Sequence, residues 1–190
     1  LFVSCHSEKE KQQPTFGIVI HGGAGTILKE NMSDEMEKAY LKKLTEAITT
    51  GHAILKVGGT SQDAVEKTIH VMENSPLFNS GKGAVLTANE TIALDASFMD
   101  GKTLNSGAIA GVKHVKNPIS AAIKVMHNSP HVLLSGEGAD QFAAEQNLET
   151  VPESYFITQR RIKALRRVQE LETNKKTTRH SSDQLFYDNQ

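Results

Sequence analysis

Tryptophan is absent from the sequence, and aromatic residues make up only 5% of its 190 residues. This shortage argues against a carbohydrate-binding platform or a surface that stacks nucleic-acid bases. The single cysteine, Cys5, excludes an intrachain disulfide and a cysteine-based zinc cluster. No charge of one sign dominates, since 21 basic residues stand against 22 acidic ones, so no nucleic acid or other polyanion is indicated as a partner.

Several sequence signatures of catalytic sites are also missing. The chain has no HExxH motif for a catalytic zinc ion and no G-x-S-x-G nucleophile elbow. The glycine-rich segment over 21–25 lacks the third glycine of the dinucleotide-binding pattern, and Gly81-Lys82 is not followed by the Ser or Thr of a Walker loop. Nucleotide binding is therefore disfavoured. No apolar run reaches the roughly 20 residues that a membrane-spanning helix needs.

The first five residues, Leu1 to Cys5, are mostly apolar and end in a small residue followed by cysteine. This pattern resembles the end of a bacterial lipoprotein signal, in which Cys5 would carry the lipid and polar residues 6–13 would form a tether. We therefore expect residues 1–14 to be a signal remnant and tether, and the protein to be periplasmic or membrane-tethered. The alternative is a frayed terminus with an incidental cysteine, in a cytoplasmic protein.

Hydrophobic periodicity and turn residues divide the rest of the chain into short elements. An apolar run over 16–20 predicts a buried strand that leads into the glycine turn at 21–23. Ser33 is placed to cap a helix that Gly58-Gly59 ends, and Thr60 or Ser61 to begin a second helix that ends near residue 76. The other predicted elements are strands over 84–87, 91–99, 104–112 and 131–134, and helices over 118–126, 137–146 and from residue 152 onward.

Composition adds detail to three of these elements. The strand over 104–112 is rich in glycine and alanine, which indicates that another layer packs closely on it. The basic run over 160–167 is interpreted as a solvated helix face rather than a nucleic-acid site. After Glu172 the sequence is polar and lacks any period, so residues 173–190 are predicted to be a flexible linker. The order of the elements favours an α+β fold with one domain over 15–172.

Six motifs occur in an order that points to one family: HGGAG at 21–25, SPLFNSGKGAV at 75–85, LDASFMDG at 94–101, GAIAGV at 107–112, SPHVLL at 129–134 and GEGA at 136–139. Together they closely resemble the α-subunit of plant-type L-asparaginases, also called isoaspartyl peptidases. The resemblance runs from about Phe16 to about Arg167, which is most of the chain.

The resemblance implies a four-layer αββα N-terminal-nucleophile hydrolase sandwich, of which this chain would be the α-subunit half. The precursor would cut itself before a threonine, and that threonine would attack asparagine or a β-aspartyl dipeptide with its own amine as the base. Thr173, Thr177 and Thr178 lack the glycine that precedes the cut, so the nucleophile is expected C-terminal to Gln190. The implied assembly is an (αβ)₂ heterotetramer with the protein's own β-subunit.

The resemblance also assigns site residues within this chain. Gly22 and Gly23 match glycines whose backbone approaches the nucleophile, and Asn79 matches an asparagine that shapes the site. Residues 72–82 match a sodium-binding stabilisation loop, and no other cofactor is implied. The implied sodium ligands are the backbone carbonyl oxygens of Met72, Glu73, Ser75, Phe78, Ser80 and Lys82. An ordinary helix-to-strand connection is the alternative interpretation of this loop.

Two further hypotheses remain open on the sequence. A glycosylasparaginase-like or threonine-aspartase relative would share the fold and differ in the substrate pocket. A non-catalytic fragment or binding module would have the motifs without the activity.

Overall fold

The computed structural model describes residues 16–23, 30 and 32–187. Cys5 and the tether over 1–14 lie outside these residues, as do Ala24 and Gly25 of the first glycine-rich motif. The lipid anchor therefore stays a prediction.

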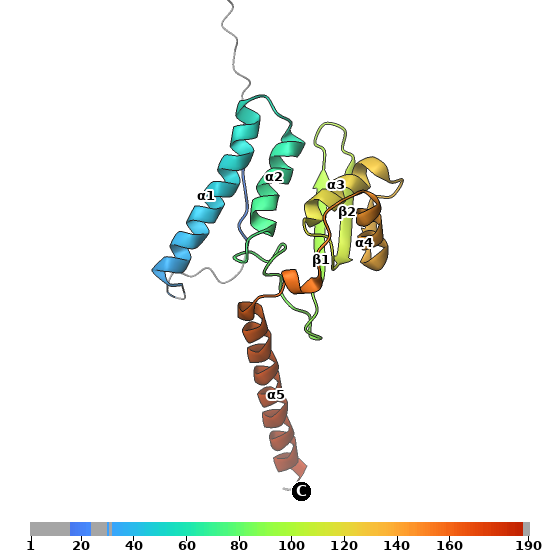
Figure 1. Cartoon of the computed structure of the whole chain (residues 1–190). Coiled ribbons are helices and arrows are strands. Elements are labelled where there is room, and N and C mark those ends of the chain that lie inside the picture. Colours follow the sequence, from blue (N-terminus) through green and yellow to red (C-terminus); the bar gives the residue numbers. More distant parts are fainter. Residues whose placement is uncertain (1–15, 24–29, 31, 188–190) are drawn as a thin grey trace, which may run out of the picture.

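Two antiparallel helices, α1 (Asp34–Lys56) and α2 (Ser61–Glu73), form one side of the molecule (Figure 1). Their boundaries confirm the predicted caps. The Ser33 side chain accepts a hydrogen bond from the Met36 amide, and the Thr60 side chain accepts one from the Asp63 amide. At Gly51 the two helices approach so closely that a Cβ atom would collide with the Thr68 side chain.

A three-stranded sheet, β1 (Leu94–Met99), β2 (Ser106–Val112) and β3 (Leu133–Ser135), forms the other side, with strand order β1-β2-β3. β2 is antiparallel to β1 and parallel to β3. Helices α3 (Pro118–Asn128) and α4 (Gly136–Glu145) pack on this sheet (Figure 1). A Cβ atom on Gly107 of β2 would collide with the backbone of α3, which confirms the close layer expected from this glycine-rich strand.

The main hydrophobic core lies between the sheet and its helices. Ile109 and Val112 of β2 are buried against Val125 of α3, and Phe156, after the 3-10 helix Glu153–Tyr155, closes one end. The side chains of β1 alternate, and Asp95, Ser97 and Met99 are exposed. The fold is thus α+β, with helices on a small mixed sheet.

The strand predicted over 16–20 is not formed with any part of the chain that the structure describes. These residues form no ladder with any described segment, and the side chain of Val19 is 94% exposed. Ile18 nevertheless lies against Gly51 of α1, so the segment runs alongside the helix pair (Figure 1). A strand needs a neighbour to satisfy its backbone groups, and a short sequence pattern cannot supply that neighbour.

The strand expected over 84–87 is also absent. Thr87 donates its amide to the Thr91 carbonyl across a tight turn in which Glu90 has a φ of 62°. A turn at Asn89-Glu90 separates the two segments, but they do not form a ladder.

Helix α5 (Gln159–Tyr187) runs through most of the predicted flexible tail and projects away from the rest of the fold (Figure 1). A helix beyond Glu172 was not expected, because residues 173–187 have neither an apolar stripe nor a high content of strong helix formers. Their role as a linker stays a prediction. No helix in the described part of the chain is both long enough and apolar enough to cross a membrane.

Candidate functional site

Gly22 and Gly23 border a cavity of about 290 Å³ that lies against α1. Gly23 has a φ of +114°, a conformation that side-chain-bearing residues rarely adopt, and its amide donates to Nδ1 of His21 at 3.2 Å. A Cβ atom on Gly22 would stand only 3.1 Å from a methyl group of Leu44. Gly22 therefore allows a close approach to α1, whereas Gly23 is required by its backbone conformation.

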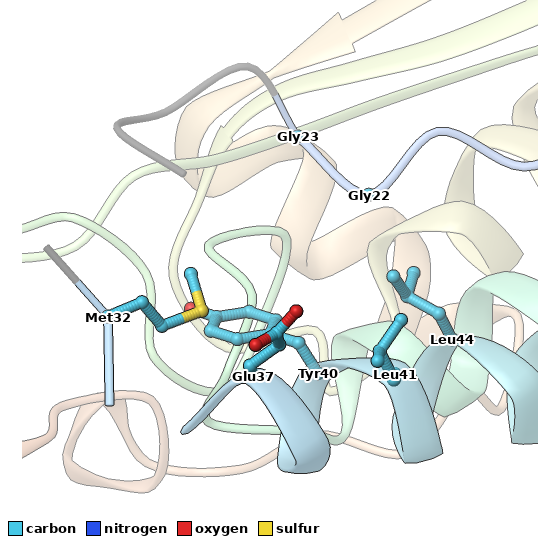
Figure 2. Close-up of a pocket in the computed structure, with 7 residues that line it drawn as sticks. All are labelled: Gly22, Gly23, Met32, Glu37, Tyr40, Leu41 and Leu44. Atoms are coloured by element: carbon cyan, nitrogen blue, oxygen red, sulfur yellow. The ribbon is translucent and has the colours of Figure 1, made fainter. Parts of the chain in front are cut away.

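Figure 2 shows the side chains of α1 rising toward these two glycines, with Met32 beside the ring of Tyr40. The other lining residues of α1 are Glu37, Leu41 and Leu44. The wall is mostly apolar, with backbone groups on one side and one carboxylate. No serine, threonine or cysteine side chain lines this cavity in the described part of the chain, so the residues that line it supply no such nucleophile.

The segment between α2 and residue 84, here called loop 74–83, folds back on the end of α2. The Lys82 amide donates to the Glu73 carbonyl at 2.7 Å, and the Ser75 amide donates to the Met72 carbonyl at 3.1 Å. A Cβ atom on Gly81 would collide with the Glu73 carbonyl, and one on Gly83 would lie 2.6 Å from the carbonyl oxygen of Pro76. Backbone oxygens therefore crowd the inner side of the loop, where glycines leave room for them.

Carbonyl oxygens are the ligands expected for the implied sodium ion, and their convergence on one ion stays a prediction. The inward carbonyls include those of Glu73 and Phe78, two of the six implied sodium ligands; the latter oxygen lies 2.9 Å from the position of a Cβ on Gly83. Hard cations such as sodium take oxygen ligands of this kind irrespective of the side chain. Among residues 16–23, 30 and 32–187, no three His, Cys, Asp or Glu side chains are grouped so that they could hold a metal ion.

Tyr40 joins the cavity to the loop. Its hydroxyl donates to the Leu77 carbonyl at 2.8 Å, and its ring meets the ring of Phe78 edge-on, with the centroids 5.8 Å apart. Asn79 is exposed and is not among the residues that line the cavity. The structure thus brings Gly22 and Gly23 to the cavity and leaves Asn79 on the neighbouring loop.

A buried carboxylate at the end of α2 was not predicted as such. Glu73 is 1% exposed and accepts hydrogen bonds from the Asn117 side chain and the Ile119 amide, both at 2.9 Å. Burial raises the pKa of this carboxyl to about 8, although the two donors act in the opposite direction. Asn117 makes no side-chain cap of its own, so Glu73 satisfies the first free amide of α3 in its place. The Asn117-Pro118 pair is a local signal for a helix start, but nothing local points to Glu73 as its partner.

A second polar group joins α2 to α3 along a groove of about 450 Å³. The Ser120 hydroxyl donates to the Glu66 carboxylate and lies 2.7 Å from Nε2 of His70. In a catalytic triad the histidine stands between the hydroxyl and the acid, whereas here the hydroxyl stands between the other two. Burial lowers the pKa of His70 and favours its neutral form. The group therefore clamps two helices and does not activate a nucleophile.

Comparison with known proteins agrees with the family resemblance of the motifs. A family model described as asparaginase matches residues 13–189. The isoaspartyl peptidase of Escherichia coli strain K12 is 45% identical over 148 residues, which cover 78% of this chain and 46% of that protein. The plant-type L-asparaginase of Pyrococcus furiosus is 51% identical over 126 residues, covering 66% of this chain and 40% of that protein.

A mammalian relative, the isoaspartyl peptidase/L-asparaginase of Mus musculus, is 41% identical over 148 residues, covering 78% of this chain and 44% of that protein. The chain spans about half the length of the curated relatives that it matches. Because the family model covers almost all of the sequence, the chain belongs to the asparaginase family.

Proposed function

We propose that this chain is the α-subunit portion of an amidohydrolase that converts L-asparagine to L-aspartate and ammonia and cleaves β-aspartyl dipeptides. The observation that carries the proposal is the match to relatives named isoaspartyl peptidase and L-asparaginase, in which this chain corresponds to about half of each protein. The glycine pair at the cavity agrees with it, because a backbone without side chains can line a reacting centre.

The nucleophile in this proposal is a threonine that follows Gln190 and becomes an N-terminus when the precursor cuts itself. Its hydroxyl attacks the side-chain amide of asparagine, its free amine takes the proton, and ammonia leaves from the tetrahedral intermediate. Water then releases aspartate from the acyl-enzyme. Backbone amides can stabilise the negative charge that develops on the oxygen. Gly22 and Gly23 would form one wall of that centre.

The proposed assembly is a four-layer αββα sandwich completed by the protein's own β-subunit, with two αβ units in the heterotetramer. The exposed surface of this chain supports it. Val19 and Leu133 are more than half exposed, as are Met99 and Val132. A second layer packed on the segment 16–20 and on the sheet would remove such side chains from water.

Loop 74–83 and the end of α2 are proposed to hold a structural sodium ion through the carbonyl oxygens named above. The loop is already closed by the bond between the Lys82 amide and the Glu73 carbonyl, which limits the ordering that ion binding would require. The thermal midpoint of the complete protein should therefore rise when choline in the buffer is replaced by sodium at the same ionic strength. Equal midpoints in the two buffers would argue for an ordinary connecting loop.

The test of the activity is to express the complete reading frame that contains this chain. A denaturing gel should show two fragments, and mass spectrometry should find a threonine at the start of the smaller one. The processed protein should release ammonia from asparagine and hydrolyse a β-aspartyl dipeptide, and replacing that threonine by alanine should abolish both activities and the cut. A precursor that stays whole and inactive would reject the proposal. Activity confined to glycosylated asparagine would favour a glycosylasparaginase-like enzyme.

A further inference from the structure

Two adjacent arginines at the start of α5, Arg160 and Arg161, donate hydrogen bonds to backbone carbonyls of loop 74–83. Arg160 donates to the Pro76 carbonyl at 2.9 Å and to the Leu77 carbonyl at 3.1 Å. Arg161 donates through Nε to the Gly83 carbonyl at 2.6 Å. The loop is therefore held near both of its ends by one turn of a helix that lies more than 75 residues further along the chain.

Arg160 makes a third contact that reaches α1. Its other terminal nitrogen donates to the Tyr40 hydroxyl at 3.2 Å, and that hydroxyl donates to the same Leu77 carbonyl at 2.8 Å. Arg160, Tyr40 and Leu77 thus form a closed set of three hydrogen bonds. A hydroxyl that both donates and accepts in this way has a fixed rotation, so the direction of the Tyr40 ring is fixed with it.

The ring of Tyr40 is part of the wall of the cavity beside Gly22 and Gly23 (Figure 2). The Arg160 guanidinium group therefore binds the Pro76 and Leu77 carbonyls and also positions the Tyr40 ring in the cavity wall. A bound carbonyl oxygen is fixed more firmly by a charged donor than by a neutral one, because charge-assisted hydrogen bonds are about twice as strong.

We propose that Arg160 is a positioning residue that couples the start of α5 to the cavity beside Gly22 and Gly23, through Tyr40 and loop 74–83. The helix that leaves the domain toward Gln190 is thereby linked to the site. The link to catalysis rests on the proposed function, whereas the link between Arg160 and the loop can be measured without any activity.

Lysine cannot replace arginine at this position. A guanidinium group is planar and presents five N–H donors in a fixed fork, so it can serve three acceptors in different directions. A lysine ammonium is a point charge whose position follows a flexible stem. Arg160→Lys should therefore keep the positive charge and lose the forked arrangement of donors. This variant separates an electrostatic role from a positioning role.

Arg167 offers a matched control on the same helix. It is exposed, and among the described residues no hydrogen bond joins it to loop 74–83. Arg167→Met removes the same charge from α5 as Arg160→Met, and both methionines keep an unbranched apolar stem. Tyr40→Phe removes only the hydroxyl in the set of three bonds.

The experiment measures amide hydrogen exchange and steady-state kinetics on the complete protein. In Arg160→Met, peptides covering 74–83 should exchange about tenfold faster, because a lost charge-assisted bond lowers the free energy of local opening. Arg160→Lys should behave like Arg160→Met, and Arg167→Met like the wild type. The value of kcat/KM should fall about tenfold or more in Arg160→Met. The fall should come from kcat and not from KM, because displaced site groups slow the reaction.

Tyr40→Phe should act through the same set of bonds. Its effect on exchange should therefore not add to that of Arg160→Met in the double variant. If Arg160→Met fails to accumulate, the comparison of Tyr40→Phe and Arg160→Lys with the wild type decides the question. Unchanged exchange over 74–83 in these variants overturns the coupling.

The outcomes also separate this inference from the proposed function. Faster exchange in variants of a protein whose wild type hydrolyses nothing would support the coupling and reject the hydrolase. Normal exchange in variants of an active protein would reject the coupling alone. Faster exchange with unchanged kcat and KM would show that the loop is held by Arg160 without any link to the site, which also overturns the proposal as stated.

Discussion

Glu73 shows how one buried residue serves two structural tasks. Its carbonyl oxygen closes loop 74–83 by accepting the Lys82 amide, while its carboxyl group accepts the Ile119 amide at the start of α3. Helix N-termini leave their first amides without intrahelical partners, so a carboxyl group from another helix can replace the missing local cap. This residue thus ties the helix pair to the sheet layer.

The burial of Glu73 predicts a pH dependence of stability. Its pKa is raised to about 8 in the folded chain, against 4.5 for the ordinary group, so the folded state holds the proton more tightly. The stabilisation is complete below about pH 4.5 and is lost as the pH rises to about 8. Glu73→Gln cannot titrate. The thermal midpoint of the wild type should therefore fall relative to this variant across that window, by roughly 5–10 °C.

This measurement is made by calorimetry at constant sodium concentration. The matched control is Glu170→Gln, which removes an exposed carboxylate of α5 and should follow the wild type at every pH. A constant difference between wild type and Glu73→Gln over the whole window would contradict the prediction, because it would mean that the carboxyl group keeps its ordinary pKa.

At the scale of elements, local interactions decide what a sequence can predict. Helices α1 and α2 start where expected because Ser33 and Thr60 cap them through residues three positions away. The turn between β1 and β2, both expected as strands, is local in the same way, since Asp100 accepts the Lys102 amide. Such contacts lie within a few residues and are visible in a short window.

Elements that depend on distant partners were predicted less well. The segment 16–20 has the composition of a strand but no strand partner among the described residues, and α5 is helical beyond Glu172 without an apolar stripe. Residues 173–187 hold mostly Thr, Asn, Ser, His and Asp beside a few strong helix formers, so neither periodicity nor helix propensity indicated this helix.

The candidate site divides in the same way. Gly22 and Gly23 were predicted from a short motif and both border the cavity beside α1, while their role at a reacting centre stays a prediction. The bond from Asn117 to Glu73 joins residues 44 positions apart, and that from Arg160 to Pro76 joins residues 84 apart. No periodicity or motif within one window connects such residues. They become visible only when the packing of α2, α3 and α5 places them together.

At the scale of the whole molecule, the segment over 16–20 has one satisfied side and one open side. Ile18 and Ile20 are partly buried and border a cavity that Val65 and Ile69 of α2 also line, whereas Val19, at the edge of the same cavity, is 94% exposed. This alternation of partly buried and exposed side chains is typical of an extended segment that packs on helices with one face and leaves the other face open to a second layer. In the proposed sandwich that second layer covers Val19.

Val19→Asp tests this arrangement in the complete protein. If Val19 is covered there, the substitution buries an unpaired charge and should lower stability by about 3 kcal/mol or more, which calorimetry would detect as a drop of roughly 10 °C in the thermal midpoint. The matched control is Val57→Asp, because Val57 is 85% exposed in the turn after α1 and has no layer to cover it in the proposed sandwich. Its midpoint should stay close to that of the wild type. Equal midpoints for the two variants would place residues 16–20 on the surface of the finished molecule, and the open face of this segment would then need a different explanation from a second sheet.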